Sequence, residues 1–230
     1  MVSYWTALKA KTSNLKAHLM PISLLSQNPL YFIAWVAAIL VALTFHEFSH
    51  ALAAHFLGDQ TAKRMGRLSL NPLVHLDPVG FLALVLIGFG WGKPVPYNPY
   101  NLRYPKWGST MVAAAGPISN ILMVVIFGLV LKFVAPFLPS GNLLTEFLVL
   151  LIELNLILCI FNLIPVPPLD GSKFLLSALA APKHYKTRFM LETRGPIILL
   201  GLILLDSLSG LNLLSGIFSL AVNFTLKFFS

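Results

Sequence analysis

The chain has 230 residues, of which 57% are hydrophobic and only 10% are charged, whereas a typical soluble domain is about 25% charged. This composition excludes an ordinary soluble domain and predicts a multi-pass integral membrane protein. The formal net charge of +8 does not indicate a nucleic-acid partner, because the basic residues are spread over loops that flank apolar runs. The single cysteine, Cys159, excludes an intrachain disulfide and a cysteine metal cluster.

The apolar runs predict an all-α fold. A membrane-spanning backbone must satisfy its own hydrogen bonds, and long unbroken apolar runs do so as helices, whereas a β-barrel needs alternating segments of about ten residues. The sequence predicts three spanning helices, at residues 30–57, 110–133 and 143–164.

The ends of the chain are less regular. Residues 1–28 are polar to mildly amphipathic, and we expect them to lie on the membrane surface as an interfacial segment. The last apolar stretch, 196–229, is interrupted at 206–210 and is either one long broken span or two short pieces. We therefore expect a bundle of about four to six transmembrane helices, with a membrane core at 29–195 and a C-terminal membrane helix region at 196–230.

The segment between the first two spans has an unusual composition. Residues 79–91 are apolar, but thirteen residues are too few to cross a bilayer as a helix, which needs about twenty, so we predict a re-entrant piece. The following "GKPVPYNPYNLRYP" holds four prolines and is expected to be extended. It could pair with residues 60–70 as short β-strands near the cytoplasmic face, and it is a candidate lid or substrate-binding edge.

The orientation in the membrane follows from the lysines and arginines of the loops. Loops 58–108 and 172–195 lie on the same side if the three spans cross fully, and together they hold eleven of the sixteen basic residues. The opposite side would hold Lys9, Lys11, Lys16, Lys132 and Lys227. We therefore expect the two basic loops in the cytoplasm, with the protein in the cell (plasma) membrane.

The first span contains the stretch "TFHEFSHALAAHFLGD" at residues 44–59. His46 and His50 are four residues apart, so they share one helix face one turn apart and can bind the same Zn²⁺. Glu47 lies beside His46, where it can act on water as a general base. This HExxH pattern on a helix is typical of zinc hydrolases.

The depth of this stretch argues against a chance match. His46 precedes the predicted helix end at Leu57 by eleven residues, or roughly 16 Å, which is too deep for short side chains to snorkel to the interface. Ionisable groups inside a membrane are costly and usually functional. His55 lies about 180° around the helix from His46, so we interpret it as an interfacial histidine.

Catalytic zinc usually has three protein ligands and an open position. The carboxylates Glu146 and Glu153 lie on the wrong side of the bilayer, whereas Asp206 is not excluded by depth. His75 and Asp77 lie in the loop "NPLVHLDPVG", where turn chemistry also explains them. Asp170 is the preferred third ligand, because the prolines of "FNLIPVPPLDGSKF" unwind the third span at the depth of the histidines.

The chain resembles the site-2 protease family of intramembrane zinc metalloproteases. "HEFSH" is similar to the HExxH motif of the family, and "NLIPVPPLDG" to its second motif, NxxPxPxLDG; "GRLSLNPLVHLDPVG" and "AAGPISN" also resemble family segments. The resemblance covers about residues 40–175. It is to a compact form, without a PDZ-like or CBS-like insertion.

The resemblance implies one Zn²⁺ per chain, held by His46, His50 and Asp170, with Glu47 as the catalytic base. It further implies that Asn162 holds the substrate or stabilises the oxyanion, and, more weakly, that Asn120 lies near the site. The expected function is hydrolysis of a peptide bond within or near a transmembrane segment of a membrane protein. The expected partners are that substrate and the lipid bilayer.

Two other classes of protein stay open at this point. Intramembrane histidines and aspartates also occur along ion paths, so the chain could be a membrane zinc-binding or zinc-transport protein without proteolytic activity. It could also be an inactive scaffold that binds membrane helices. Neither alternative needs a glutamate directly after the first ligand, which favours the protease.

Overall fold

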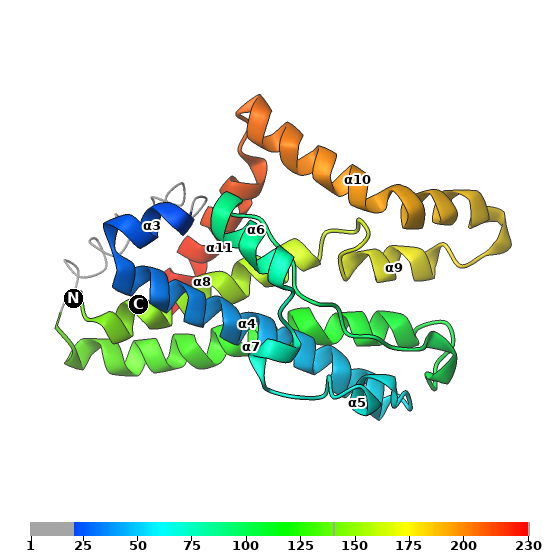
Figure 1. The fold of residues 1–230 in the computed structure, drawn as a ribbon, viewed down its shortest axis with the longest axis horizontal. Coiled ribbons are helices and arrows are strands. Elements are labelled where there is room, and N and C mark those ends of the chain that lie inside the picture. The colour runs from blue at the N-terminus through cyan, green and yellow to red at the C-terminus, as the bar shows by residue number, and fades with distance from the viewer. Residues whose placement is uncertain (1–20, 140, 230) are drawn as a thin grey trace.

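A computed structural model describes residues 21–139 and 141–229 of the chain. The described residues form helices joined by loops (Figure 1). The helices are α3 (Pro21–Gln27), α4 (Pro29–Phe56), α5 (Thr61–Arg64), α6 (Pro78–Ile87), α7 (Gly108–Val134), α8 (Leu143–Asn162), α9 (Gly171–Ala178), α10 (Tyr185–Ser209) and α11 (Leu213–Phe229). Four short 3₁₀ turns, η1 to η4, lie at Pro72–Val74, Pro99–Asn101, Ala135–Phe137 and Pro182–His184.

Three long helices form the centre of the molecule. Helices α4, α7 and α8 are each long and apolar enough to cross a membrane, and they run side by side (Figure 1). Their bounds match the three helices expected from hydropathy. Trp35 of α4 packs against Leu150 and Leu151 of α8. Because lipid tails are as apolar as these side chains, van der Waals packing rather than the hydrophobic effect stabilises such a contact between membrane helices.

The last two helices form a broken pair. Helices α10 and α11 meet at an angle of 86°, and they are long and apolar enough to cross a membrane only when taken together. Asp206 accepts hydrogen bonds from the backbone N–H groups of Leu213 and Leu214 at 2.6 and 3.2 Å, so it closes the bend by capping α11. The described residues thus provide three candidate spans, or four if this pair is one span. Only the count of four falls within the expected four to six helices, at the lower limit of that range.

Helix α10 has few contacts with the rest of the described bundle. Its buried residues are Gly195 and Leu199, and a Cβ atom on Gly195 would lie 2.6 Å from Cβ of Pro167. Helix α11 returns to the bundle and packs on α7 and α8, where Phe229 lies against Gly128. The α10 arm is therefore joined to the bundle near the proline loop that precedes α9 (Figure 1).

The segment between α4 and α7 differs in part from expectation. Helix α6 has ten apolar residues, begins at the cap Asp77 and ends at Gly88 in the left-handed conformation; its length fits the re-entrant prediction. The expected strands do not form: residues 60–70 contain the short α5, and the bridging contact found in the described chain joins Leu76 to Gly92. Prolines lack the N–H that a ladder requires, which explains why the proline-rich segment does not extend this contact into a strand.

The expected domain boundaries are only partly visible. The interfacial segment 1–28 lies mostly outside the described residues, except for α3 at its end. The described helices pass from the expected core, 29–195, into the C-terminal region within α10 rather than at a loop. The division at 195–196 stays a prediction.

The end of α4 is fixed by one buried carboxylate. Asp59 is fully buried and accepts hydrogen bonds from the backbone and hydroxyl of Thr61, the backbone of Asn98 and the amide of Asn101. Burial alone would raise the pKa of Asp59, but these hydrogen bonds outweigh it and lower the pKa below its usual value. Asp59 therefore holds the loop after α4 to residues 98–101.

We predict that Asp59→Asn lowers the melting temperature in detergent by several degrees at pH 7, since losing hydrogen bonds to a charged group costs about 1–3 kcal/mol. Because the folded-state pKa of Asp59 is lowered, its contribution is present above the unfolded pKa of about 3.9 and is lost as pH falls through the folded value. The difference in melting temperature between the variant and wild type should therefore shrink below about pH 4. Glu192→Gln, at an exposed carboxylate, is the control; an equal difference at pH 7 and pH 3 would contradict the prediction.

Candidate active site

One face of α4 presents two histidines to the interior. His46 and His50 are 3% and 7% exposed, and their Nε2 atoms lie 3.1 Å apart. The four-residue spacing on a helix brings the two rings together, one turn apart, as the sequence predicts. Glu47 is also buried.

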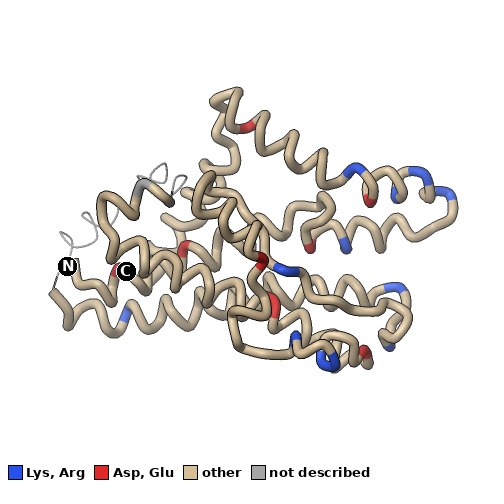
Figure 2. Tube along the Cα trace, in the orientation of Figure 1, with Lys and Arg blue, Asp and Glu red and all other residues tan. Residues whose placement is uncertain are grey.

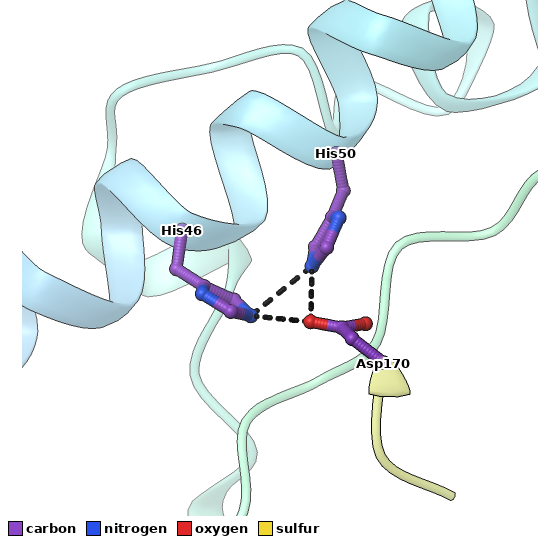
Figure 3. A group of neighbouring side chains, drawn as sticks. All are labelled: His46, His50 and Asp170. Atoms are coloured by element: carbon purple, nitrogen blue, oxygen red, sulfur yellow. Dashed lines mark hydrogen bonds and ion pairs between the residues drawn. The ribbon is translucent and has the colours of Figure 1, made fainter. Parts of the chain in front are cut away.

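Asp170 completes the group from a different part of the chain. It precedes the first residue of α9 and occupies the N-cap position, yet its side chain makes no capping hydrogen bond, although aspartate is a preferred capping residue. Instead its Oδ2 atom lies 3.2 Å from Nε2 of His46 and 3.2 Å from Nε2 of His50 (Figure 3). The carboxylate is thus directed at the two rings, and these three side chains are the group among the described residues that could hold a metal ion.

The proton positions leave three lone pairs facing one another. Nδ1 of His50 lies 2.7 Å from the backbone oxygen of Val112, and Nδ1 of His46 lies 2.6 Å from Oδ1 of Asn120. Because both partners are acceptors, each ring in its neutral form carries its proton on Nδ1 and presents a bare Nε2 atom. The buried Oδ2 of Asp170 likewise has no hydrogen bond.

Such an arrangement fits a cation. A tetrahedral zinc ion with bonds of about 2.0–2.1 Å separates its ligand atoms by about 3.3 Å, close to the 3.1–3.2 Å observed. Two imidazoles and one carboxylate are also a donor set found in catalytic zinc sites, where a fourth position stays open. The residues present therefore fit the metal.

Close approach of α7 to the rings depends on a glycine. A Cβ atom on Gly116 would lie 2.5 Å from Nε2 of His50 and 2.6 Å from Cε1 of His46. Real Cβ atoms do not make such contacts, so a side chain at this position would push the imidazoles out of place. Gly116 belongs to "AAGPISN", and its role in the site is steric.

Two contacts hold the helix that carries Asp170. Gly171 lies against the backbone oxygens of Leu163 and Ile164, so a Cβ there would clash with the end of α8. Further along α9, the hydroxyl of Ser177 lies 2.7 Å from the hydroxyl of Thr110 on α7. Helix α9 is therefore fixed to α8 at its start and to α7 near its end.

A buried arginine, Arg67, holds the proline-rich segment and interacts electrostatically with Glu47. Arg67 is 6% exposed and donates hydrogen bonds to the backbone oxygens of Lys93 and Pro94. Burial lowers the pKa of the Arg67 guanidinium below its usual range, and the negative charge of Glu47 partly offsets this. Arg67 thus links the two regions: it holds the proline-rich segment through hydrogen bonds and interacts electrostatically with Glu47 in the site.

The other candidates lie apart from the three-residue group. His55 binds Gln60, as its position around the helix predicts. His75 is buried and contacts the backbone oxygen of Ser69 through Nε2. Asp77 and Asp206 cap helices α6 and α11, which accounts for both carboxylates structurally.

The structure separates the two asparagines that the resemblance singled out. Asn120 is fully buried between His46 and Asn155, whose Oδ1 accepts a hydrogen bond from Nδ2 of Asn120 at 2.8 Å. Asn162 instead donates to the oxygen of Leu158 within its own helix. Sequence reasoning missed Asn155, although a carboxamide inside the apolar run of α8 was a detectable signal.

Comparison with known proteins identifies the family. The family model described as "Peptidase family M50" matches residues 138–202, which include α8, Asp170 and α9. YwhC of Bacillus subtilis, named "Putative zinc metalloprotease", is 39% identical to this chain over 173 residues, which cover 72% of this chain and 77% of YwhC. The chain belongs to peptidase family M50.

More distant relatives carry the same description. Rip2 of Mycolicibacterium smegmatis is 32% identical over 61% of this chain and 55% of its own length, and MJ0611 of Methanocaldococcus jannaschii is 27% identical over 64% and 71%. No solved structure gives a significant match. This M50 peptidase is an intramembrane zinc metalloprotease of the site-2 type, and the resemblance drawn from its motifs is confirmed.

We predict that Gly116→Ala sharply lowers the zinc content of the purified protein, because the added methyl group would occupy the space of the imidazoles. Gly201→Ala is a matched control: it also lies in a long helix, but a Cβ there meets nothing within 4 Å. Zinc per chain is measured by inductively coupled plasma mass spectrometry. Full zinc content in the Gly116 variant would contradict the close packing around the histidines.

Proposed function

We propose that His46, His50 and Asp170 bind the catalytic zinc ion, one per chain, and that Glu47 is the catalytic base. The observation that carries this proposal is the meeting of two imidazole nitrogens and one carboxylate oxygen at 3.1–3.2 Å. Without a cation these lone pairs would repel one another in a low-dielectric interior. The substrate is a peptide bond within or near a transmembrane segment of another membrane protein.

Glu47 transfers protons in this mechanism. When bound, zinc supplies Lewis acidity that activates water and polarises the scissile carbonyl. The carboxylate of Glu47 accepts a proton from the attacking water and then donates it to the leaving amine. Its place directly after His46 keeps it beside the reacting atoms without making it a metal ligand.

Asn162 and Asn120 have different proposed roles. Asn162 is the last residue of α8, and the eight-residue proline loop separates it from Gly171, the first residue of α9. Its amide would have to leave the oxygen of Leu158 to stabilise an oxyanion. Asn120 already has a partner in the protein for its Oδ1 and its Nδ2 atoms. We therefore assign it to holding His46 rather than to contacting substrate.

The substrate must unwind before it is cleaved. In a helix each carbonyl is hydrogen-bonded and shielded, so helix-breaking residues near the cut favour reaction. The irregular backbone that follows Lys93 and Pro94, whose oxygens accept hydrogen bonds from Arg67, is the surface along which we propose that an unwound segment lies. Water reaches the reacting bond from the end of the bundle that carries α5 and α9.

The orientation is proposed from charge. Most lysines and arginines gather at the end of the bundle that carries α5, the start of α10 and the loop before α7 (Figure 2), and such loops are cytoplasmic under the positive-inside rule. His46 precedes the end of α4 at Phe56 by ten residues, or about 15 Å. The chemistry thus lies inside the plasma membrane and opens to the cytoplasm.

Glu47→Gln tests the proposed base. In proteoliposomes with a model single-pass substrate, we expect cleavage to fall at least about 100-fold, since general base catalysis contributes about 10²–10⁴-fold, while zinc content is retained. Glu192→Gln, at the exposed partner of Arg188, should cleave normally. Normal cleavage by Glu47→Gln would refute the assignment, and proteomics of membranes carrying each form would identify natural substrates.

Asn162→Ala tests the oxyanion proposal. If the Asn162 amide stabilises the oxyanion only in the transition state, kcat should fall by about 10²–10³-fold with little change in KM. The same assay and substrate serve for the measurement. A change confined to KM would assign Asn162 to substrate binding, and no change would remove it from the mechanism.

A further inference from the structure

Two buried asparagines connect His46 to the backbone of α8. Nδ1 of His46 lies 2.6 Å from Oδ1 of Asn120, Nδ2 of Asn120 donates to Oδ1 of Asn155 at 2.8 Å, and Nδ2 of Asn155 donates to the oxygen of Leu151 at 2.7 Å. Both asparagines are fully buried. This chain of hydrogen bonds joins α4, α7 and α8.

The direction of these hydrogen bonds is set at the end of the series that lies farthest from His46. The backbone oxygen of Leu151 can only accept, so Asn155 must present its NH₂ group to it and its oxygen to Asn120. Asn120 must then present its own NH₂ group to Asn155 and its oxygen to His46. His46 is left with a proton on Nδ1 and a bare lone pair on Nε2, the atom that faces His50 and Asp170.

The two histidines are held by different means. Nδ1 of His50 donates directly to the backbone oxygen of Val112, which cannot turn over. The partner of His46 is a carboxamide, whose oxygen and NH₂ ends have nearly the same shape and can exchange by rotation. The tautomer of His46 therefore depends on whatever fixes the carboxamide of Asn120.

We propose that Asn155 is a positioning residue for the metal site: acting through Asn120, it keeps His46 in the tautomer whose Nε2 can bind zinc. This inference rests on the proposed role of His46 as a ligand. Without Asn155, Asn120 is free to turn its NH₂ group toward His46. Nδ1 would then accept, the proton would reside on Nε2, and the lone pair would be lost to the metal.

The test compares zinc affinities of the full chain in detergent by competition with a chelator. Asn155→Leu should weaken zinc binding by about 10–100-fold, the usual effect of removing a hydrogen-bonding partner behind a ligand. Asn120→Asp should bind zinc more tightly than Asn155→Leu, because a carboxylate has only acceptors to offer Nδ1, although its second oxygen then faces Oδ1 of Asn155. In the N120D background, adding N155L should cause no further loss, because there is no carboxamide left to orient.

A structural role alone predicts a different pattern. If Asn155 only packs α8 against α7, N155L weakens zinc binding equally in both backgrounds, and that result overturns the proposal, as does an unchanged affinity in N155L. Thr145→Val, at another fully buried polar position of α8, is the control for loss of helix packing and should bind zinc normally.

Two further variants keep the test decisive if N155L does not fold or if His46 is not a zinc ligand. If N155L does not fold, Asn155→Asp replaces it: this side chain still accepts from Asn120, so normal zinc binding is expected and a large loss overturns the proposal. His46→Ala separates the inference from the proposed function. Unchanged zinc binding in H46A overturns both the assignment of His46 as a ligand and the proposed positioning role of Asn155. Zinc binding that is lost in H46A but kept in N155L overturns the positioning role alone.

Discussion

Three acceptor atoms, brought together inside an apolar bundle, are the constraint on which this structure depends. Two imidazole nitrogens and one carboxylate oxygen lie 3.1–3.2 Å apart, and burial makes their mutual repulsion costly unless a cation joins them. The elements that carry these atoms are held in place by contacts with α7 and α8. The fold can thus be understood as a means of holding these atoms in place while membrane helices surround them.

Each surrounding helix supplies a different kind of support. Helix α7 gives a glycine that makes room for the rings, a backbone oxygen that orients His50 and a hydroxyl that binds α9. Helix α8 supplies Asn155, and the proline loop after it delivers Asp170. Polar groups are expensive within a membrane, and here Asn120 and the backbone oxygen of Val112 each orient one of the two proposed histidine ligands.

The sequence predicts the local parts of this arrangement better than the long-range ones. The helix spacing of His46 and His50 and the length of each apolar run are local properties, and all three spans form as expected. The contact of Asn120 with Asn155 depends on how α7 and α8 are aligned, which no local pattern encodes. Asp206 remained a possible ligand because the 86° bend that it caps is equally invisible in the sequence. The prolines of 92–105 prevent the strands expected there, and the turn η2 at Pro99–Asn101 interrupts the extended conformation expected for this segment.

X-ray absorption at the zinc edge of wild type and Asp170→Cys tests the proposed metal site most directly. The native chain has one cysteine, Cys159, buried in α8, so the wild-type spectrum should show two imidazoles and oxygen ligands but no sulfur. If Asp170 is the third ligand, the variant should gain one zinc–sulfur distance of about 2.3 Å and keep both imidazoles. A variant that retains full zinc without a sulfur ligand, or a wild-type spectrum with fewer than two imidazoles, would contradict the proposed site.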